Sequence, residues 1–249
     1  MEGFGSPLFL GGIMGIKLNL IDGAGALIWK LRNRTPWDFN LFGTKIFCGA
    51  QGSGKTLSAV RWVRQLADIY PAMQICTNLE LHDFPLHTEI FEYTGVESLF
   101  EQENGEQGIV YLIDEIQLEL NSLESRQIPL SVITEISQQR KQKKMIVGTA
   151  QVLMRLAKPI REQFDQIIDC KCIGGVMQWN HVYSVEDIKQ TEAGEIASIE
   201  NGRLDMFFHS VSDYLRYDTA AKVLKRTKDY KALAKKYDAE LYGGVEDES

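Results

Sequence analysis

Eight consecutive residues, Gly49-Ala50-Gln51-Gly52-Ser53-Gly54-Lys55-Thr56, match the phosphate-binding pattern G-x-x-x-x-G-K-[ST]. Residues 45–48, just before them, are apolar apart from Lys45 and predict a strand, and apolar residues at helical spacing over 57–70 predict an amphipathic helix. Strand, glycine-rich loop and helix stand in the order that this pattern requires. The alternative is a chance match in an ordinary glycine turn.

Each residue type in the pattern has a role in binding a nucleoside triphosphate. Glycines let backbone N–H groups surround the phosphates, and the N-terminus of the next helix adds its partial positive charge. Lys55 is expected to reach the β- and γ-phosphates, and the Thr56 hydroxyl is expected to ligate Mg²⁺. The candidate ligands of ATP are Gly49, Ala50, Gln51, Gly52, Ser53, Gly54, Lys55 and Thr56.

A second motif follows the apolar run 109–113, which is typical of a strand buried on both faces of a parallel sheet. The run ends in Asp114 and Glu115. Asp114 is expected to hold Mg²⁺ through water, and Glu115 to polarise the attacking water as general base. The alternative is an acidic turn that caps the next helix. The second acid favours a hydrolysing ATPase over a nucleotide-binding switch.

Composition sets limits on this interpretation. The chain has 249 residues and is 44% hydrophobic, which suits one α/β domain with appendages. Its net charge of -7 argues against an indiscriminate nucleic-acid binder, although a local basic patch would still permit DNA contact. Four cysteines lie mainly in apolar runs, and we expect buried reduced thiols and no disulfide framework, as in the cytoplasm. The chain is not expected to be secreted, because it lacks a basic leading region and a cleavage site.

Strand and helix patterns continue to alternate past the loop, which predicts a mostly parallel sheet with helices on both faces. Residues 74–78 and 145–148 are expected to be strands, and 96–102 and 130–143 helices. The fold class is therefore an α/β P-loop NTPase of the additional-strand (ASCE, RecA-like) class. Gln151, just after the strand 145–148, is the candidate γ-phosphate sensor, and the alternative is a simple strand-ending amide.

Several short motifs together carry a family resemblance. They are Thr77-Asn78, Ser125-Arg126, Ser137-Gln138-Gln139-Arg140, Gly148-Thr149-Ala150-Gln151 and Lys158-Pro159-Ile160-Arg161-Glu162-Gln163-Phe164-Asp165. Over residues 45–172 the chain resembles the zonular occludens toxin (Zot-like) family of phage ATPases. More broadly it is similar to the FtsK/HerA group of DNA-translocating and DNA-packaging ATPases. The resemblance implies a homo-oligomeric ring, ATP and Mg²⁺ as cofactors, and DNA as a partner.

The chain also departs from that family. Filamentous-phage export members typically carry a membrane-spanning helix after the ATPase domain, and nothing after residue 172 is apolar for long enough. This favours a motor for genome packaging or virion assembly, located in the host cytoplasm, on the virion or peripherally on a membrane. The alternatives are a membrane-associated assembly or secretion ATPase that acts on protein, with a capsid or membrane component as partner, and a nucleotide-gated scaffold.

Basic residues supply candidates for an arginine finger offered to a neighbouring subunit, namely Arg126, Arg140 and Arg161. The basic run Arg140, Lys141, Lys143 and Lys144 either complements the negative end of a helix or forms a DNA-facing loop.

We expect four segments. Residues 1–40 form an apolar arm, of which 1–34 either lie on a membrane or pack on the chain or a neighbour. The ATPase core is 41–185. Residues 186–240 hold a β-hairpin and a basic helix, the latter either a solvated face or a DNA or membrane contact. In that region 177–183 is expected to be an edge strand, Asn201-Gly202 a hairpin turn and 204–208 the returning strand. Residues 241–249 form an acidic tail expected to be disordered.

Overall fold

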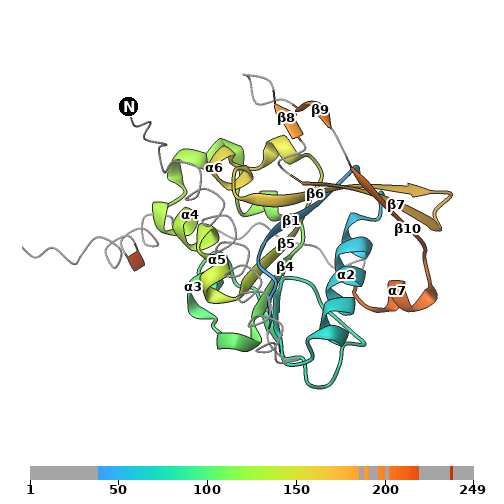
Figure 1. Ribbon diagram of the computed structural model, residues 1–249, viewed down its shortest axis with the longest axis horizontal. Helices are drawn as coiled ribbons and strands as arrows, with labels where there is room; N and C mark the ends of the chain where they lie inside the picture. Colours follow the sequence, from blue (N-terminus) through green and yellow to red (C-terminus); the bar gives the residue numbers. More distant parts are fainter. Residues whose placement is uncertain (1–38, 185–187, 191–195, 200–201, 219–235, 238–249) are drawn as a thin grey trace, which may run out of the picture. The chain divides into compact units, whose positions relative to one another are not determined.

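The computed structural model describes residues 39–184, 188–190, 196–199, 202–218 and 236–237 (Figure 1). The predicted membrane-binding segment 1–34, the tail 241–249 and almost all of the predicted basic helix lie outside these residues. In the described part of the chain, no helix is long and apolar enough to cross a membrane.

Eight strands form one sheet in the order β10-β7-β6-β1-β5-β4-β2-β3. The strands are β1 (Gly43–Cys48), β2 (Gln74–Thr77), β3 (Ile90–Glu92), β4 (Ile109–Ile113), β5 (Lys144–Ala150), β6 (Phe164–Ile173), β7 (Met177–Ser184) and β10 (Arg203–Phe208). The six strands from β3 to β6 are parallel, whereas β7 runs antiparallel to β6 and β10. Strand β5 lies between the phosphate-loop strand β1 and the acidic strand β4, which confirms the predicted additional-strand arrangement.

The strands β6, β7 and β10, at one side of the sheet, correct the prediction of an edge strand at 177–183. Strand β7 is not an edge strand, because β6 and β10 flank it and β10 forms the edge. The predicted returning strand is present as β10, with Leu204 opposite His181. Between β7 and β10 the chain forms a separate pair, β8 (Ile188–Gln190) and β9 (Ile196–Ile199), and Asn201 of the predicted turn lies outside the described residues. The predicted segments 41–185 and 186–240 thus contribute strands to one sheet.

Helices cover both faces of the sheet (Figure 1). One face carries α2 (Lys55–Ile69) and α7 (Val211–Leu215), and the other carries α3 (Ser98–Glu101), α4 (Leu130–Ser137), α5 (Gln139–Gln142) and α6 (Lys158–Arg161). Short 3-10 turns are η1 (Gly105–Gln107), η2 (Ile116–Leu118), η3 (Ser122–Gln127) and η4 (Leu153–Arg155). Alternate side chains of β4 enter opposite cores, with Tyr111 among the residues packed beneath α4 and Leu112 among those beneath α2. Burial on both faces explains the uninterrupted apolar run.

The predicted helix 130–143 is broken in two. Gln138 has φ −94° and ψ 5°, and its N–H is shared between the carbonyls of Thr134 and Glu135. The Ser137 hydroxyl also donates to the Thr134 carbonyl at 2.7 Å, and such local bonds compete with a regular helix. The break turns Gln139 inward, where its amide donates to the Thr44 hydroxyl at 2.9 Å.

The cysteines are free, as predicted, with three buried and Cys172 partly exposed. Burial raises the pKa of Cys48 and of Cys76 to about 12, so both stay protonated thiols at neutral pH.

The basic run at the start of β5 is not a uniform surface feature. Lys144 belongs to the strand rather than to the preceding helix, and its side chain is 3% exposed. Its ammonium group lies 2.7 Å from Glu135 and donates to the Leu99 carbonyl at 2.6 Å. The prediction that Lys144 ends a helix or faces DNA is therefore wrong. A buried cation is retained only with a partner of this kind.

Replacing Lys144 with alanine should destabilise the protein by about 3–5 kcal/mol, because Glu135 would be left largely buried without its cation. Urea unfolding followed by circular dichroism measures this change. Lys141→Ala, at an exposed neighbouring position, serves as the control and should change stability little. The double variant Lys144→Met/Glu135→Leu should recover most of the loss. Equal stability of Lys144→Ala and Lys141→Ala would refute the role of the pair.

Candidate functional site

The phosphate loop closes directly onto the first turn of α2. The Ser53 N–H donates to the Ala50 carbonyl at 3.1 Å, and the Ser58 N–H donates to the Gly54 carbonyl at 2.9 Å. Gly54, which precedes the helix, has φ +79°, and a Cβ there would lie 2.1 Å from Gln178 Oε1. Glycine is therefore required by both the backbone and the space. Lys55 follows as the first residue of the helix and is 6% exposed.

Asp114 is held by side chains from three other segments. One carboxylate oxygen, Oδ1, accepts from the Thr56 hydroxyl at 2.8 Å and from the Thr149 hydroxyl at 2.7 Å. The amide of Asn78 donates to the Asp114 carbonyl at 2.9 Å and accepts from the Asp114 N–H at 2.8 Å. Thr56 and Asp114, the predicted metal ligands, are thus in direct contact.

Glu115 lies beside the loop lysine. Its Oε1 is 3.4 Å from Lys55 Nζ, its N–H donates to the Thr149 hydroxyl at 2.9 Å, and Gln117 donates to its other oxygen. The backbone has φ +52°, a left-handed conformation that costs energy for a non-glycine residue and is concentrated at functional sites. Glu115 precedes η2, but its side chain makes no capping hydrogen bond, so the geometry does not favour a helix-capping role.

The pKa of the partly buried Asp114 carboxyl is shifted. Burial raises its pKa above the ordinary value of 3.8, and the neighbouring Glu115 acts in the same direction. Hydrogen bonds from Thr149 and Thr56, together with the Lys55 charge, oppose the rise. A divalent cation at these oxygens would favour the charged form.

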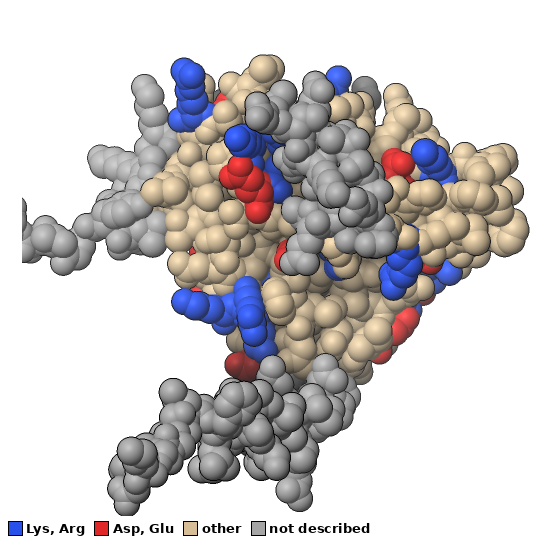
Figure 2. Space-filling view, turned by 45° about the horizontal axis from the view of Figure 1, so that its top comes forward, with Lys and Arg blue, Asp and Glu red and all other residues tan. Residues whose placement is uncertain are grey.

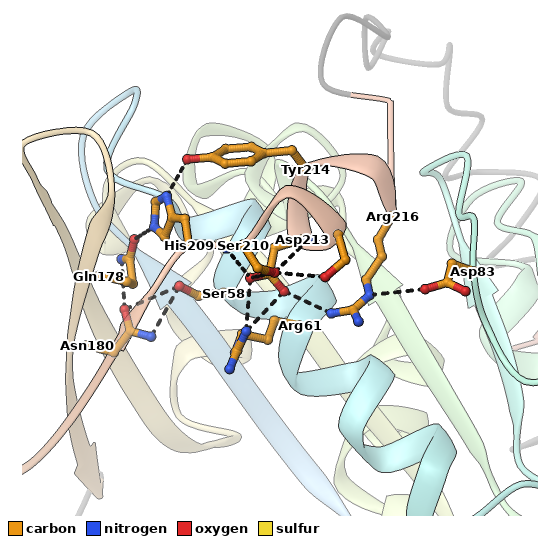
Figure 3. A network of polar contacts seen from close by, with 11 residues as sticks. Ser58, Arg61, Asp83, Gln178, Asn180, His209, Ser210, Asp213, Tyr214 and Arg216 are labelled. Carbon is orange, nitrogen blue, oxygen red and sulfur yellow. Dashed lines mark hydrogen bonds and ion pairs between the residues drawn. The ribbon is translucent and has the colours of Figure 1, made fainter.

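Side chains of strand β7 form hydrogen bonds to the phosphate loop and to the start of α2. These contacts were not predicted from the sequence. Gln178 is fully buried, and its amide donates to the Ser53 carbonyl at 2.9 Å. Asn180 accepts from the same amide at 2.9 Å and donates to the Ser58 hydroxyl at 3.1 Å (Figure 3). Two polar residues at a spacing of two in an otherwise strand-like run face the same side of a strand, and this is the signal that could have found them.

The segment 209–218 passes from β10 to the loop after β2. His209 Nε2 lies 3.1 Å from Gln178 Oε1 at one end. In the middle, Asp213 of α7 lies 2.9 Å from Arg61 of α2 (Figure 3). At the other end, Tyr217 pairs with Leu81 in a β-bridge. This segment was not predicted to take part in the site.

A cavity of about 400 Å³ lies against the phosphate loop. It is lined by loop and helix residues, by Asp114, and by residues of β6, of the β6–β7 turn and of the segment 209–218. These lining residues are Gln51, Gly52, Gly54, Lys55, Thr56, Leu57, Leu79, Asp114, Cys172, Gly175, His209, Tyr214, Tyr217 and Asp218. Burial, with Asp114 nearby, raises the pKa of Tyr217 to about 12, so its hydroxyl stays protonated at neutral pH.

Eight predicted site residues do not line this cavity: Gly49, Ala50, Ser53 and Glu115, which belong to the loop or contact Lys55, and Gln151, Arg126, Arg140 and Arg161. Gln151 follows β5 directly and is partly exposed. Arg126 is exposed in η3, and the Arg140 guanidinium is exposed and lies 5.3 Å from the centre of the Phe42 ring. Arg161 ends α6 and contacts the Met154 sulfur. The structure therefore brings together the loop, Asp114 and Glu115. Gln151 follows Ala150, whose carbonyl accepts from the Gly49 N–H at 3.3 Å, whereas the three candidate fingers lie outside the cavity lining.

Surface charge on one face of the molecule appears in Figure 2. Among the described residues visible in this view, Lys and Arg side chains are spread singly or in small groups between uncharged and acidic residues. This agrees with the acidic composition of the chain.

The fold resembles that of solved structures. The N-terminal domain of zonular occludens toxin from Neisseria meningitidis is 14% identical, with a TM-score of 0.52 over 72% of this chain and 100% of that chain. The genome packaging NTPase B204 from Sulfolobus turreted icosahedral virus 2, in complex with ATP-gammaS, is 11% identical, with a TM-score of 0.45 over 64% and 97%. The DNA-packaging ATPase B204 from Sulfolobus turreted icosahedral virus is 11% identical, with a TM-score of 0.43 over 65% and 98%.

The likeness to the zonular occludens toxin domain confirms the predicted resemblance at the level of the fold. The chain has an α/β fold with a mostly parallel sheet and helices on both faces, like that of the zonular occludens toxin domain. The chain matches no protein-family profile and no curated protein sequence.

Replacing Asp114 with asparagine should raise the melting temperature measured without nucleotide at pH 7.5. A raised carboxyl pKa means that the folded state binds the proton more readily than the unfolded state, so folding stability falls as pH rises through the folded pKa. The neutral amide removes this cost. We therefore expect a higher melting temperature for the variant than for the wild type.

Scanning calorimetry at several pH values tests the assignment. The gain should shrink as pH is lowered toward the ordinary carboxyl pKa, because the wild-type acid is then also neutral. Asp68→Asn is the control, because Asp68 is an exposed acid that pairs with Arg64 on α2, the helix after the loop. It should not raise the melting temperature. A pH-independent effect at Asp114 would contradict a raised pKa.

Proposed function

We propose that the chain is an ATP-hydrolysing motor of a virus or mobile element, acting in DNA translocation for genome packaging or virion assembly. One observation carries the hydrolytic part of this proposal. Residues from two separate motifs meet at the loop, with Thr56 Oγ1 2.8 Å from Asp114 Oδ1 and Lys55 Nζ 3.4 Å from Glu115 Oε1. Hydrolysis needs a phosphate-binding lysine, two metal-binding groups and a general base at the same place. A nucleotide switch does not need the second acid, Glu115.

The donor set at the loop suits magnesium. Mg²⁺ prefers oxygen ligands, and the Thr56 hydroxyl and Asp114 carboxylate present two of them side by side. These two residues would hold the ion, Thr56 directly and Asp114 through water. When bound, the ion neutralises charge on the β- and γ-phosphate oxygens. The loop residues 49–56 would hold the phosphates through backbone N–H groups, with Lys55 adding its charge.

Glu115 would act as the general base. It takes a proton from a water molecule whose oxygen attacks the γ-phosphorus; the bond to the β–γ bridging oxygen breaks, leaving ADP and inorganic phosphate. The Thr149 hydroxyl fixes the Glu115 backbone, and Lys55 faces its carboxylate. The phosphates of an incoming nucleotide compete with Glu115 for Lys55. Nucleotide binding therefore releases the Glu115 carboxylate from its contact with Lys55. Gln151, at the end of β5, is the proposed sensor of the γ-phosphate.

The wider role rests on the family motifs. We propose a homo-oligomeric ring in which Arg126, Arg140 or Arg161 acts on a neighbouring subunit. Their positions away from the cavity of their own chain suit a role in trans. DNA is the proposed partner, with the host cytoplasm or the virion as the location. Peripheral membrane contact through residues 1–34 and a capsid component are further proposed partners.

The Glu115→Gln variant should lower steady-state ATP turnover about 10²–10⁴-fold, the usual contribution of a general base, while ATP binding is retained. Phosphate release is measured for both proteins across protein concentration, with and without double-stranded DNA. DNA should stimulate the wild type only. Glu106→Gln, at an exposed acid, is the control and should behave as the wild type.

Other outcomes identify the alternatives. Turnover that ignores DNA would favour a membrane-associated assembly ATPase acting on protein. A wild type that binds ATP without turnover, alone and with DNA, would favour a nucleotide-gated scaffold. Turnover that rises steeply with protein concentration and is lost in Arg126→Ala, Arg140→Ala or Arg161→Ala would identify the finger.

A further inference from the structure

The cavity beside the loop is lined by two chemically different groups of residues. Lys55, Thr56 and Asp114 form a charged group that the proposed hydrolysis uses. His209 and Tyr214, with the turn residue Gly175, form an aromatic group to which no function has been given, and Tyr217 and Asp218 of the same segment also line the cavity. A nucleotide has the same division between a charged triphosphate and a planar base.

The Tyr214 ring is partly exposed and held in place by its hydroxyl. The residue is 43% exposed, and the hydroxyl donates to the Gly175 carbonyl at 3.1 Å and contacts His209 Nδ1 (Figure 3). His209 meets the ring edge to face, with planes at 76°. Among the described residues, no aromatic ring stacks face to face on Tyr214.

A continuous chain of hydrogen bonds connects this ring to the phosphate loop. His209 Nε2 lies 3.1 Å from Gln178 Oε1, and Gln178 Nε2 donates to the Ser53 carbonyl at 2.9 Å. Gln178, the middle residue of this connection, is fully buried, whereas His209 is partly exposed. The ring is therefore positioned relative to the loop before any ligand binds, which lowers the entropy cost of binding.

The geometry points to Tyr214 as the stacking platform for the base of the bound nucleotide, with His209 and Gln178 as positioning residues. This inference rests on the proposed function, because the loop must hold the phosphates. A base stacks on an aromatic ring through its apolar face, and every base has such a face. Recognition by stacking alone therefore accepts several nucleoside triphosphates.

Calorimetric titration of the full chain with Mg-ATP and with inorganic tripolyphosphate separates base contacts from phosphate contacts. Tyr214→Ala should weaken ATP binding about tenfold, in the range of a lost base–aromatic stack, and leave tripolyphosphate binding unchanged. Tyr214→Phe keeps the ring and should keep the preference for ATP. Leu215→Ala, on the same helix and 66% exposed, is the control.

A second measurement locates the base without relying on affinity. Cys172 lines the cavity and is the cysteine that is not buried, since Cys48, Cys76 and Cys170 are buried and all four cysteines are free. Saturating ATP should slow alkylation of Cys172 in the wild type. Saturating tripolyphosphate, which has no base, should slow it much less.

The outcomes distinguish this inference from the proposed function. If Tyr214→Ala weakens both ligands equally, Tyr214 only supports the loop, and the stacking role is refuted while phosphate binding stands. If the variant weakens neither ligand, or if tripolyphosphate protects Cys172 as well as ATP, the stacking role also fails. If the wild type binds neither ligand, the proposed function itself fails and the inference fails with it.

Discussion

The contacts of Asp114 hold the site together. Its carboxylate accepts hydrogen bonds from the hydroxyls of Thr56 of α2 and Thr149 of β5, and its backbone N–H and carbonyl bond to the Asn78 side chain after β2. These segments are distant in sequence and meet only because β5 lies between β1 and β4 and β2 lies beyond β4. The strand order is thus a requirement of the chemistry. An order that placed β4 at the far edge of the sheet would separate the loop from the acid that completes it.

The apolar packing of the sheet explains why the carboxyl ends of its strands can carry so many polar groups. Side chains of β4 alternate between two apolar clusters, and Gly148 of β5 leaves space for Ile46 and Ile116, which would lie 2.8–3.0 Å from a Cβ there. The strands are therefore fixed by burial on both faces, and their carboxyl ends can carry groups that cost stability. Parallel α/β sheets place ligand sites at these ends for the same reason.

The sequence could predict the parts of the fold and site that local patterns encode. The bounds of β4 follow from an uninterrupted apolar run, and α2 follows from helical spacing after the loop. The partners of Asp114 could not be assigned, because Thr149 and Asn78 act across strands. Gln178 and His209 were missed for the same reason, since β10 returns to β7 only after an intervening pair of strands. The break at Gln138 depends on side-chain competition that helical periodicity does not report.

Asp114, which is partly buried, and Asp213, which is buried, differ in how the protein compensates their burial. Burial raises the pKa of Asp114, where two hydroxyls and one lysine charge compensate incompletely. At Asp213 burial also raises the pKa, but the hydrogen bonds from Ser210 and the charge of Arg61 outweigh it, and the net pKa is lowered. Asp213 therefore contributes stability above its unfolded pKa that is lost as pH falls, whereas Asp114 costs stability as pH rises through its folded pKa. Asp213, which secures the segment 209–218, has its charge fully compensated by groups of the protein. The charge of Asp114, at the loop, is compensated only in part, and a bound cation can supply the rest. A charged group whose burial the fold compensates only in part is the expected signature of a binding site rather than of a structural contact.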